Sequence, residues 1–187
     1  MSQRVSIRTA SLKDLATLVR HRRAMWQDIR PYTTRALDTA DAVYRTWLRN
    51  RLRSREAVAF IAEVRGSVPV GSGVVFLRHV DPCPLKQEAV PHIISMFTER
   101  SHRGKGIGTR IVGRLTEWCA QRGFVEITLS PAPKARALYR RVGFERGWEM
   151  SMPLSERNPL QQANRPAGRD LLRPGSRHLD SPRSESR

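Results

Sequence analysis

The stretch RGKGIG, residues 103–108, decides how the rest of the chain is interpreted. It follows an apolar run, 93–97, and opens a helical pattern of apolar residues. Glycines at alternate positions leave backbone N–H groups unobstructed where a helix begins, and the helix dipole favours an anion at that end. The stretch therefore predicts a loop that binds phosphate groups.

The spacing of the glycines excludes the commoner phosphate-binding motifs. A GxGxxG dinucleotide fingerprint requires glycine at position 109, where Thr109 stands, and no GxxxxGK sequence followed by Ser or Thr occurs. The pattern that fits is RxxGxG, formed by Arg103, Gly106 and Gly108. It resembles the pyrophosphate loop of the GNAT superfamily of acetyl-CoA-dependent N-acetyltransferases, which reads Q/RxxGxG/A between the fourth strand and the third helix.

A second segment extends this resemblance. The family's later AxxLYxxxGF pattern is matched by Ala135, Leu138, Tyr139, Gly143 and Phe144. The similarity runs from about Ile7 to about Leu154. The alternative is a glycine-rich turn between a strand and a helix that binds no ligand.

The order of the predicted elements is typical of an α/β fold. Apolar periodicity predicts strands over 5–8, 57–64, 70–79, 91–98, 124–129 and 144–152, and helices after 11, over 38–53, after 106 and after 133. In the second helix the pattern directs five residues inward: Ala42, Val43, Thr46, Trp47 and Leu52. The resemblance implies a mixed, mostly antiparallel central sheet flanked by helices and splayed between the fourth and fifth strands, where a pantetheine arm enters.

Length and composition predict one folded domain. With 187 residues the chain is expected to form a GNAT N-acetyltransferase domain over 1–154 and a basic, disordered tail over 155–187, which has few apolar residues. The first ten residues lack the apolar core of a signal peptide, and no apolar run approaches the ~20 residues of a membrane span. We expect a cytoplasmic protein, monomeric or homodimeric.

The net charge of +17 has two interpretations. The arginines attract polyanions such as nucleic acid, or they reflect a composition bias on solvated surfaces that also favours an anionic cofactor. The second is favoured because aromatic residues are not interleaved with the arginines as a stacking platform requires. We still expect the arginines to support a weak, salt-sensitive association with polyanions.

The resemblance assigns the residues that hold acetyl-CoA, the expected co-substrate. Backbone groups of Met96, Phe97 and Thr98 are implied to pair with the pantetheine arm. An N–H freed by a bulge in that strand polarises the thioester carbonyl. The pyrophosphate is implied to lie on Arg103, Gly104, Lys105, Gly106, Ile107, Gly108 and Thr109.

Tyr139 is the expected proton donor. Acetyl transfer expels a thiolate whose conjugate acid has a pKa of ~8.5, below the ~10 of tyrosine, so a hydrogen bond is a more plausible contribution than full proton transfer. The alternative is a tyrosine that only packs in the core. The asparagine often found seven residues earlier in the family is Ala132 here, which puts one cofactor hydrogen bond in doubt.

His92 is the expected general base, because some relatives place a glutamate there, eleven residues before the loop arginine. Period-two alternation puts His92 on the strand face of Ile94, Met96 and Thr98. A structural histidine is the alternative, and the other candidate bases are Glu63, Glu88 and Glu99. Histidine, cysteine and carboxylate residues do not cluster at metal-ligand spacing, so no metal is expected.

The sequence thus predicts an N-acetyltransferase that moves acetyl from acetyl-CoA to a primary amine by direct attack. Trp26 and Tyr32 are expected to border the acceptor, which is a protein amine, an antibiotic or a small metabolite. The rival function is a binding module, either a catalytically silent acyl-CoA-binding module or a basic nucleic-acid-associated protein. The presence of Tyr139 argues against the silent module.

Overall fold

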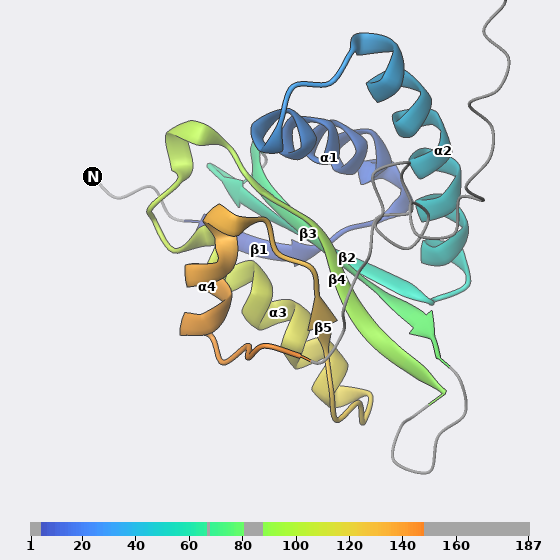
Figure 1. Cartoon of the computed structure of the whole chain (residues 1–187), viewed down its shortest axis with the longest axis vertical. Helices are drawn as coiled ribbons and strands as arrows, with labels where there is room; N and C mark the ends of the chain where they lie inside the picture. Colours follow the sequence, from blue (N-terminus) through green and yellow to red (C-terminus); the bar gives the residue numbers. More distant parts are fainter. Residues whose placement is uncertain (1–4, 67, 81–87, 148–187) are drawn as a thin grey trace, which may run out of the picture. The chain divides into compact units, whose positions relative to one another are not determined.

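A five-stranded sheet forms the centre of the fold in the computed structural model (Figure 1). The structure describes residues 5–66, 68–80 and 88–147. The strands lie in the order β1-β2-β3-β4-β5; the first four are antiparallel to their neighbours, and β5 runs parallel to β4. The mixed, mostly antiparallel sheet expected from the sequence is confirmed.

Helices cover both faces of this sheet. The strands are β1 (Val5–Thr9), β2 (Ala57–Val64), β3 (Val68–His79), β4 (Ala89–Thr98) and β5 (Thr128–Leu129). The helices are α1 (Leu15–Ile29), α2 (Thr34–Arg53), α3 (Ile107–Gln121) and α4 (Arg136–Arg141), with 3-10 turns η1 (Leu12–Asp14), η2 (Arg100–His102) and η3 (Pro133–Ala135). Figure 1 shows α1 and α2 on one face and α3 and α4 on the other.

Two apolar clusters pack these layers together. All eight positions of β2 are buried, as expected for a strand that is covered on both faces. The cluster under α1 and α2 contains Leu18, Leu48 and Ile61, and the cluster under α3 contains Ile93 and Leu115. Each face of the sheet therefore has its own core, and β4 contributes to both.

The start of α2 and its buried face differ from the prediction. The helix begins at Thr34 rather than near 38, because the Thr33 side chain caps it by accepting from the Ala36 N–H at 3.2 Å. Its buried residues are Leu37, Tyr44 and Leu48. Two of the expected inward residues, Trp47 and Leu52, do pack against the cluster under α1 and α2. The other three, Ala42, Val43 and Thr46, are exposed, Val43 by 66%. For these three the prediction was wrong because the ring of Tyr44 buries more apolar area than the smaller side chains beside it.

The two expected C-terminal strands also differ. Only Thr128–Leu129 of the expected strand 124–129 is extended and paired, and Val125 is 86% exposed. Of the strand expected over 144–152, residues 144–147 are not a strand, and 148–152 lie outside the described residues. Pattern alone was insufficient because a strand also needs a ladder partner, and β4 offers one only at two positions.

The expected boundary at 154/155 and the tail lie outside the described residues. The compact unit that contains the sheet ends at Glu145. None of the helices in the described part of the chain combines the length and the hydropathy that crossing a bilayer requires.

Candidate active site

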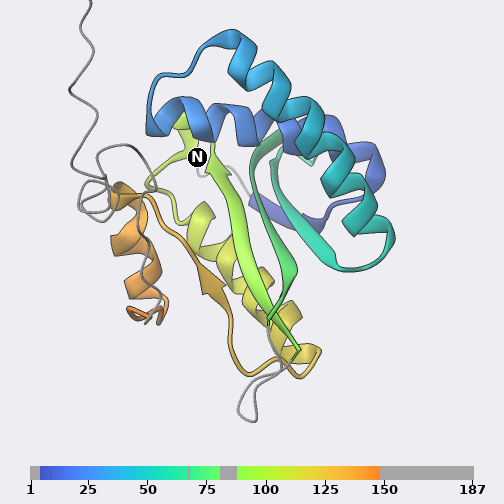
Figure 2. The same ribbon diagram turned by 45° about the vertical axis from the view of Figure 1, so that its right-hand side comes forward.

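The carboxyl-terminal half of β4 has an open edge. Strand β5 pairs with β4 only at His92↔Thr128 and Ile93↔Leu129. Among the described residues, positions 94–98 have no ladder partner on that side, and Figure 2 shows the ribbons of β4 and β5 diverging there. The expected splay between the fourth and fifth strands is confirmed. Backbone N–H and C=O groups along this edge are therefore available to a ligand.

A β-bulge lies where this open edge begins. The β3–β4 register places Val74 opposite Ile94 and Ser72 opposite Phe97, so two residues of β4 oppose one of β3. Ser95, inside the bulge, has a φ of 55°, which a non-glycine residue rarely adopts. The extra residue changes which face the following side chains occupy.

The predicted alternation along β4 is wrong beyond this bulge. The ring centroid of His92 lies 5.8 Å from that of Phe76, which packs under α1 and α2. Met96 packs instead in the α3 cluster. Phe97 contacts His21 of α1, with ring centroids 5.0 Å apart. His92 and Met96 therefore lie on opposite faces of the sheet, since the bulge shifts the two-residue period.

The loop after β4 presents unpaired N–H groups at the start of α3. Gly106 caps the helix in the left-handed region with a φ of 74°, and a Cβ added there would meet nothing within 4 Å. The first helical hydrogen bond runs from the Arg110 N–H to the Gly106 carbonyl at 3.1 Å. The N–H groups of residues 107–109 precede it, so they have no acceptor within the helix and lie at the positive end of its dipole.

Asp28, at the end of α1, holds this loop in place. Its carboxylate accepts hydrogen bonds from Arg100 Nη2 at 2.8 Å and from Arg103 Nη2, while its carbonyl accepts from Lys134 Nζ. Arg103 Nε also donates to the Thr98 carbonyl at 2.9 Å. Burial acts to raise the pKa of Asp28, but the two arginine hydrogen bonds outweigh it and the pKa is lowered. No sequence pattern identified this residue.

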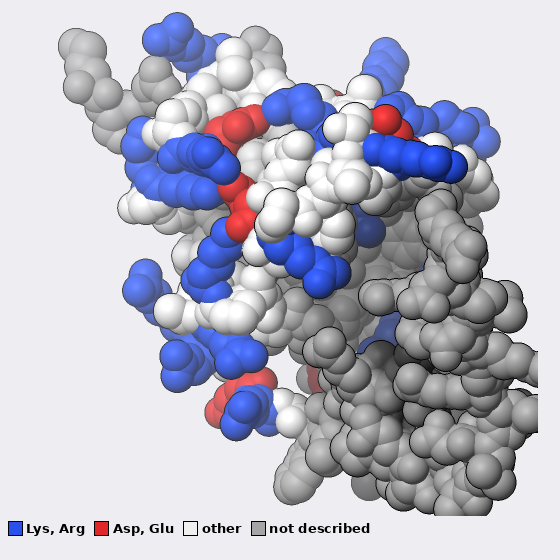
Figure 3. Space-filling model, turned by 45° about the horizontal axis from the view of Figure 1, so that its top comes forward, with Lys and Arg blue, Asp and Glu red and all other residues white. Residues whose placement is uncertain are grey.

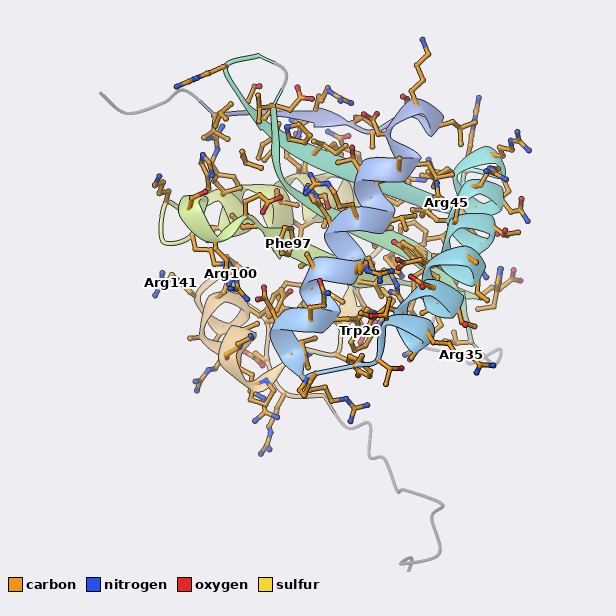
Figure 4. The ribbon with its side chains drawn as sticks, turned by 90° about the horizontal axis from the view of Figure 1, so that it is seen from above. Trp26, Arg35, Arg45, Phe97, Arg100 and Arg141 are labelled. Carbon is orange, nitrogen blue, oxygen red and sulfur yellow. The ribbon has the colours of Figure 1, made fainter. Side chains whose placement is uncertain are left out.

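A cavity of about 380 Å³ adjoins the loop. It lies between the end of α1 and the end of β4, and its lining includes Gln27, Asp28, Phe97, Glu99 and Arg100. Figure 4 labels two of these residues, Phe97 and Arg100, beside α1. The open strand edge, the cavity and the glycine loop are thus contiguous along the chain.

Tyr139 lies on α4 beside the start of α3. The two helices approach closely at Gly108, where an added Cβ would lie 3.0 Å from Leu138 Cδ1. Tyr139 is 8% exposed and packs edge-on against Phe144, with centroids 5.8 Å apart. Burial raises the pKa of the Tyr139 phenol to about 12, and within the described chain its hydroxyl has no hydrogen-bond partner. The hydroxyl therefore stays protonated and able to donate.

His92 contacts β5 through its ring nitrogen. Nδ1 lies 2.8 Å from Thr128 Oγ1, and that hydroxyl donates to the Pro91 carbonyl at 3.3 Å. Because the hydroxyl has a single proton, it accepts from His92, so Nδ1 carries the ring proton and Nε2 carries the lone pair of the neutral tautomer.

The other candidate bases have different surroundings. Glu63 accepts from Arg8 at 2.8 and 3.0 Å, and Glu99 accepts from Arg20 at 2.7 Å. Glu88 is exposed. Glu63 and Glu99 thus each have an arginine partner.

A polar cluster between α1 and β4 was not predicted. His21 is fully buried, and its Nδ1 lies 2.9 Å from Ser72 Oγ. Arg22 is part-buried, and its Nη1 donates to Ser95 Oγ at 3.3 Å. The Tyr44 hydroxyl donates to the same oxygen at 3.1 Å. Helical periodicity marks apolar stripes, so it could not identify polar residues on the buried face.

Comparison with known proteins assigns this arrangement to a family. The sequence model of the acetyltransferase (GNAT) family matches residues 21–144, which include the open half of β4, the glycine loop and α4. The chain belongs to the GNAT acetyltransferase family. Its RxxGxG loop and AxxLYxxxGF segment both fall within the matched range.

Two solved GNAT structures are similar to this chain. A GCN5-related N-acetyltransferase from Ralstonia eutropha JMP134 is 26% identical, with a TM-score of 0.73, over 81% of this chain and 99% of its own. A predicted acetyltransferase from Clostridium acetobutylicum, solved with acetyl-CoA, is 25% identical, with a TM-score of 0.71, over 80% of this chain and 96% of its own.

One curated relative matches over a shorter range. A probable glucosamine 6-phosphate N-acetyltransferase 2 from Oryza sativa subsp. japonica is 34% identical over 64 residues, which are 34% of this chain and 39% of the rice protein. The match therefore supports the family rather than the whole activity of that relative.

Proposed function

We propose that this GNAT protein transfers the acetyl group of acetyl-CoA to a primary amine by direct attack on the thioester. The observation that carries the proposal is the continuity of the open edge of β4, from Ile94 to Thr98, with the N–H groups at the start of α3. An extended arm that pairs with the edge leads directly to a phosphate-binding loop. Acetyl-CoA supplies the activated acyl group.

The glycine loop is the proposed pyrophosphate site. Backbone N–H groups of Ile107, Gly108 and Thr109 point out of the start of α3, and Arg103 and Lys105 add positive charge beside them. The left-handed Gly106 lets a phosphate approach the backbone. Asp28 supports this geometry by holding Arg100 and Arg103 in place.

Strand β4 is the proposed site of the pantetheine arm and the thioester. Met96, Phe97 and Thr98 offer backbone hydrogen bonds along the unpaired edge. The bulge at Ser95 turns the local N–H groups out of the ladder, where one of them stabilises the charge that develops on the thioester oxygen. Preorganised donors of this kind typically contribute the largest part of such rate accelerations.

Tyr139 is the proposed proton donor to the leaving sulfur. With its pKa at about 12, full proton transfer to a thiolate of reference pKa ~8.5 is uphill by roughly 5 kcal/mol. The phenol therefore assists by donating a hydrogen bond as the C–S bond breaks. Burial favours this role, because it keeps the phenol neutral at every working pH.

His92 is the proposed base that accepts the proton of the attacking amine, directly or through water. The hydrogen bond to Thr128 fixes the ring and leaves the lone pair on Nε2. An ammonium of reference pKa ~10.4 cannot attack until it loses a proton, so a group of this kind is required.

Release of free thiol from acetyl-CoA tests this function. The full chain is incubated with acetyl-CoA and a panel of primary amines that includes glucosamine 6-phosphate, a neutral amine and a polycationic antibiotic. We expect amine-dependent thiol release and a stoichiometric N-acetylated product detected by mass spectrometry. Acetyl-CoA that binds without turnover by any amine would instead support the silent acyl-CoA-binding module.

A further inference from the structure

Arg22 is a part-buried arginine that forms no ion pair with any acidic residue in the described part of the chain. Its guanidinium carbon lies 4.2 Å from the ring centroid of Tyr44 and 5.5 Å from that of Trp26. Nη1 donates to Ser95 Oγ, but Nε is buried without a hydrogen-bond partner, and Nη2 bonds to none of the described residues. Figure 4 shows Trp26 in the region between α1 and α2. The guanidinium is thus stacked and oriented but not neutralised.

Other arginines of the fold differ in this respect. Carboxylate partners lie within 3.3 Å of Arg8, Arg20, Arg23, Arg51, Arg100, Arg103 and Arg114. Asp41, the acid that attracts Arg22 through space, is hydrogen-bonded to Arg23 at 2.7 Å. Burial lowers the pKa of Arg22 because this attraction does not compensate for lost solvation. A poorly compensated buried charge costs stability, and such costs concentrate at functional sites.

The position of Arg22 connects it to the proposed chemistry. Its hydrogen-bond acceptor, Ser95, is the bulge residue where β4 loses its second ladder partner. A planar guanidinium binds carboxylate and phosphate through paired hydrogen bonds, and flanking aromatic rings fix its orientation. An anion bound to Arg22 would therefore lie next to the strand segment that faces the thioester.

We propose that Arg22 binds a carboxylate or phosphate group of the acceptor, so the acceptor is a primary amine that also carries an anion. This inference rests on the proposed function and names its substrate class. A polycationic amine is the disfavoured class: Figure 3 shows many Lys and Arg side chains and few Asp and Glu on the face that it displays. The net charge of +17 would favour the approach of an anionic acceptor over a polycationic one.

Amines of matched length test whether the enzyme prefers an acceptor that carries a phosphate, a carboxylate or no anion. The probes are 2-aminoethanol, its phosphate ester and 3-aminopropanoate, with the corresponding four-carbon amino alcohol, phosphate ester and amino acid as a longer set. For the full chain we expect kcat/KM to be about 10- to 100-fold higher for at least one anionic member of a set than for its neutral alcohol. Whichever of the phosphate ester and the amino acid has the higher kcat/KM shows whether Arg22 prefers phosphate or carboxylate.

Arg22→Gln is the test variant and Arg35→Gln is its matched control. Arg35 lies exposed on α2, so its replacement removes the same charge from a neighbouring helix. We expect Arg22→Gln to abolish the preference by raising KM for the anionic amines only, and Arg35→Gln to retain it. The proposal is overturned if the parent shows no preference, if Arg22→Gln retains it, or if Arg22→Gln slows neutral and anionic amines equally. The last result would mean that Arg22 acts on the acetyl group.

A structural role for Arg22 is tested by thermal unfolding. Arg22→Met keeps the length and the contact with the aromatic rings but removes the charge. We expect its melting temperature to equal or exceed that of the parent, because a poorly compensated charge is lost. A clearly lower melting temperature would make Arg22 a structural residue and overturn the proposal.

Direct binding measurements distinguish failure of the proposed acetyltransferase function from failure of the anion site at Arg22. If acetyl-CoA neither binds nor turns over, the acetyltransferase proposal fails, and calorimetric titration of the phosphate esters and amino acids into the parent and Arg22→Gln still tests the site. Binding that is lost in Arg22→Gln supports the anion site. Absence of binding to the parent overturns it.

Discussion

The α3 face and the α1/α2 face of β4 differ in what they bury. Toward α3, Ile93 and Met96 pack among aliphatic residues such as Ile111 and Leu115. Toward α1 and α2, Ser95 contacts two polar side chains, Arg22 and Tyr44, and Phe97 contacts a fully buried histidine. The first face positions the loop and Tyr139, and the second carries groups able to recognise a ligand. Under the proposals made above, one strand separates the acyl-donor site from the acceptor site.

The largest effect is expected on the α3 face, from Tyr139→Phe. Loss of the proton donor should lower kcat at saturating acceptor by ~10²- to 10⁴-fold, because the leaving thiolate loses its hydrogen bond. Acetyl-CoA affinity, measured by calorimetry, should be unchanged. Since the pKa of Tyr139 is about 12, its ionisation should not produce an alkaline limb in kcat below about pH 11.

Tyr44→Phe is the matched control for that variant on the opposite face. It removes a buried hydroxyl that donates to Ser95 at 3.1 Å. We expect its effect to fall on the KM of the acceptor, with kcat changed less than tenfold. The comparison between the two faces fails if Tyr139→Phe alters KM only, or if the two variants behave alike.

A smaller effect, of about 10²-fold in kcat/KM, is expected from His92→Gln. Glutamine keeps a polar side chain beside Thr128 but cannot accept the proton of the amine. The acid limb of the pH profile of kcat/KM should therefore disappear together with most of the activity. Retention of both rate and profile would make His92 structural and leave the proton to water or a glutamate.

The smallest expected effect concerns stability on the α1/α2 face. Burial and, to a smaller extent, the charge of Arg20 lower the pKa of His21 to about 4 against the attraction of Glu99. As pH falls below ~6.5, the unfolded chain takes up a proton that folded His21 refuses until about pH 4, so the free energy of unfolding decreases over this window. This residue should account for a loss of about 1 kcal/mol between pH 6.5 and 5.5.

Denaturant unfolding of His21→Gln at several pH values measures that loss. The variant should show a shallower decrease in stability with acid than the parent. His79→Gln, which replaces a side chain that is 69% exposed, should leave the slope unchanged. Equal slopes for the parent and His21→Gln would show that His21 titrates normally in the folded protein.

The sequence predicted the α3 face better than the α1/α2 face for a physical reason. Glycine spacing at 104–108 and the apolar stripe that contains Ile111 and Leu115 follow from local rules of helix initiation and burial, and the structure has α3 where they predict it. The order of the elements as far as α4 and the splay of β4 from β5 were also predicted correctly. These features depend on nearby residues or on the resemblance to the family.

The errors arise where distant residues decide the structure. The bulge at Ser95 has no glycine to mark it, and it invalidates the two-residue period that placed His92 with Met96. The buried positions of His21 and Arg22 depend on Ser72 and Ser95, which are more than 50 residues away. Propensity and periodicity carry no information on such pairings.

Calorimetric titration of acetyl-CoA into the parent, Gly106→Val and Gly113→Val tests the central claim most directly. Gly113 lies on the exposed side of α3 with an ordinary φ, so it controls for a valine on the same helix. We predict stoichiometric binding to the parent and Gly113→Val, and at least about tenfold weaker binding to Gly106→Val, whose left-handed φ of 74° and close phosphate approach exclude a branched side chain. Equal affinity of all three proteins would contradict the account, because the loop would then take no part in binding the acetyl donor.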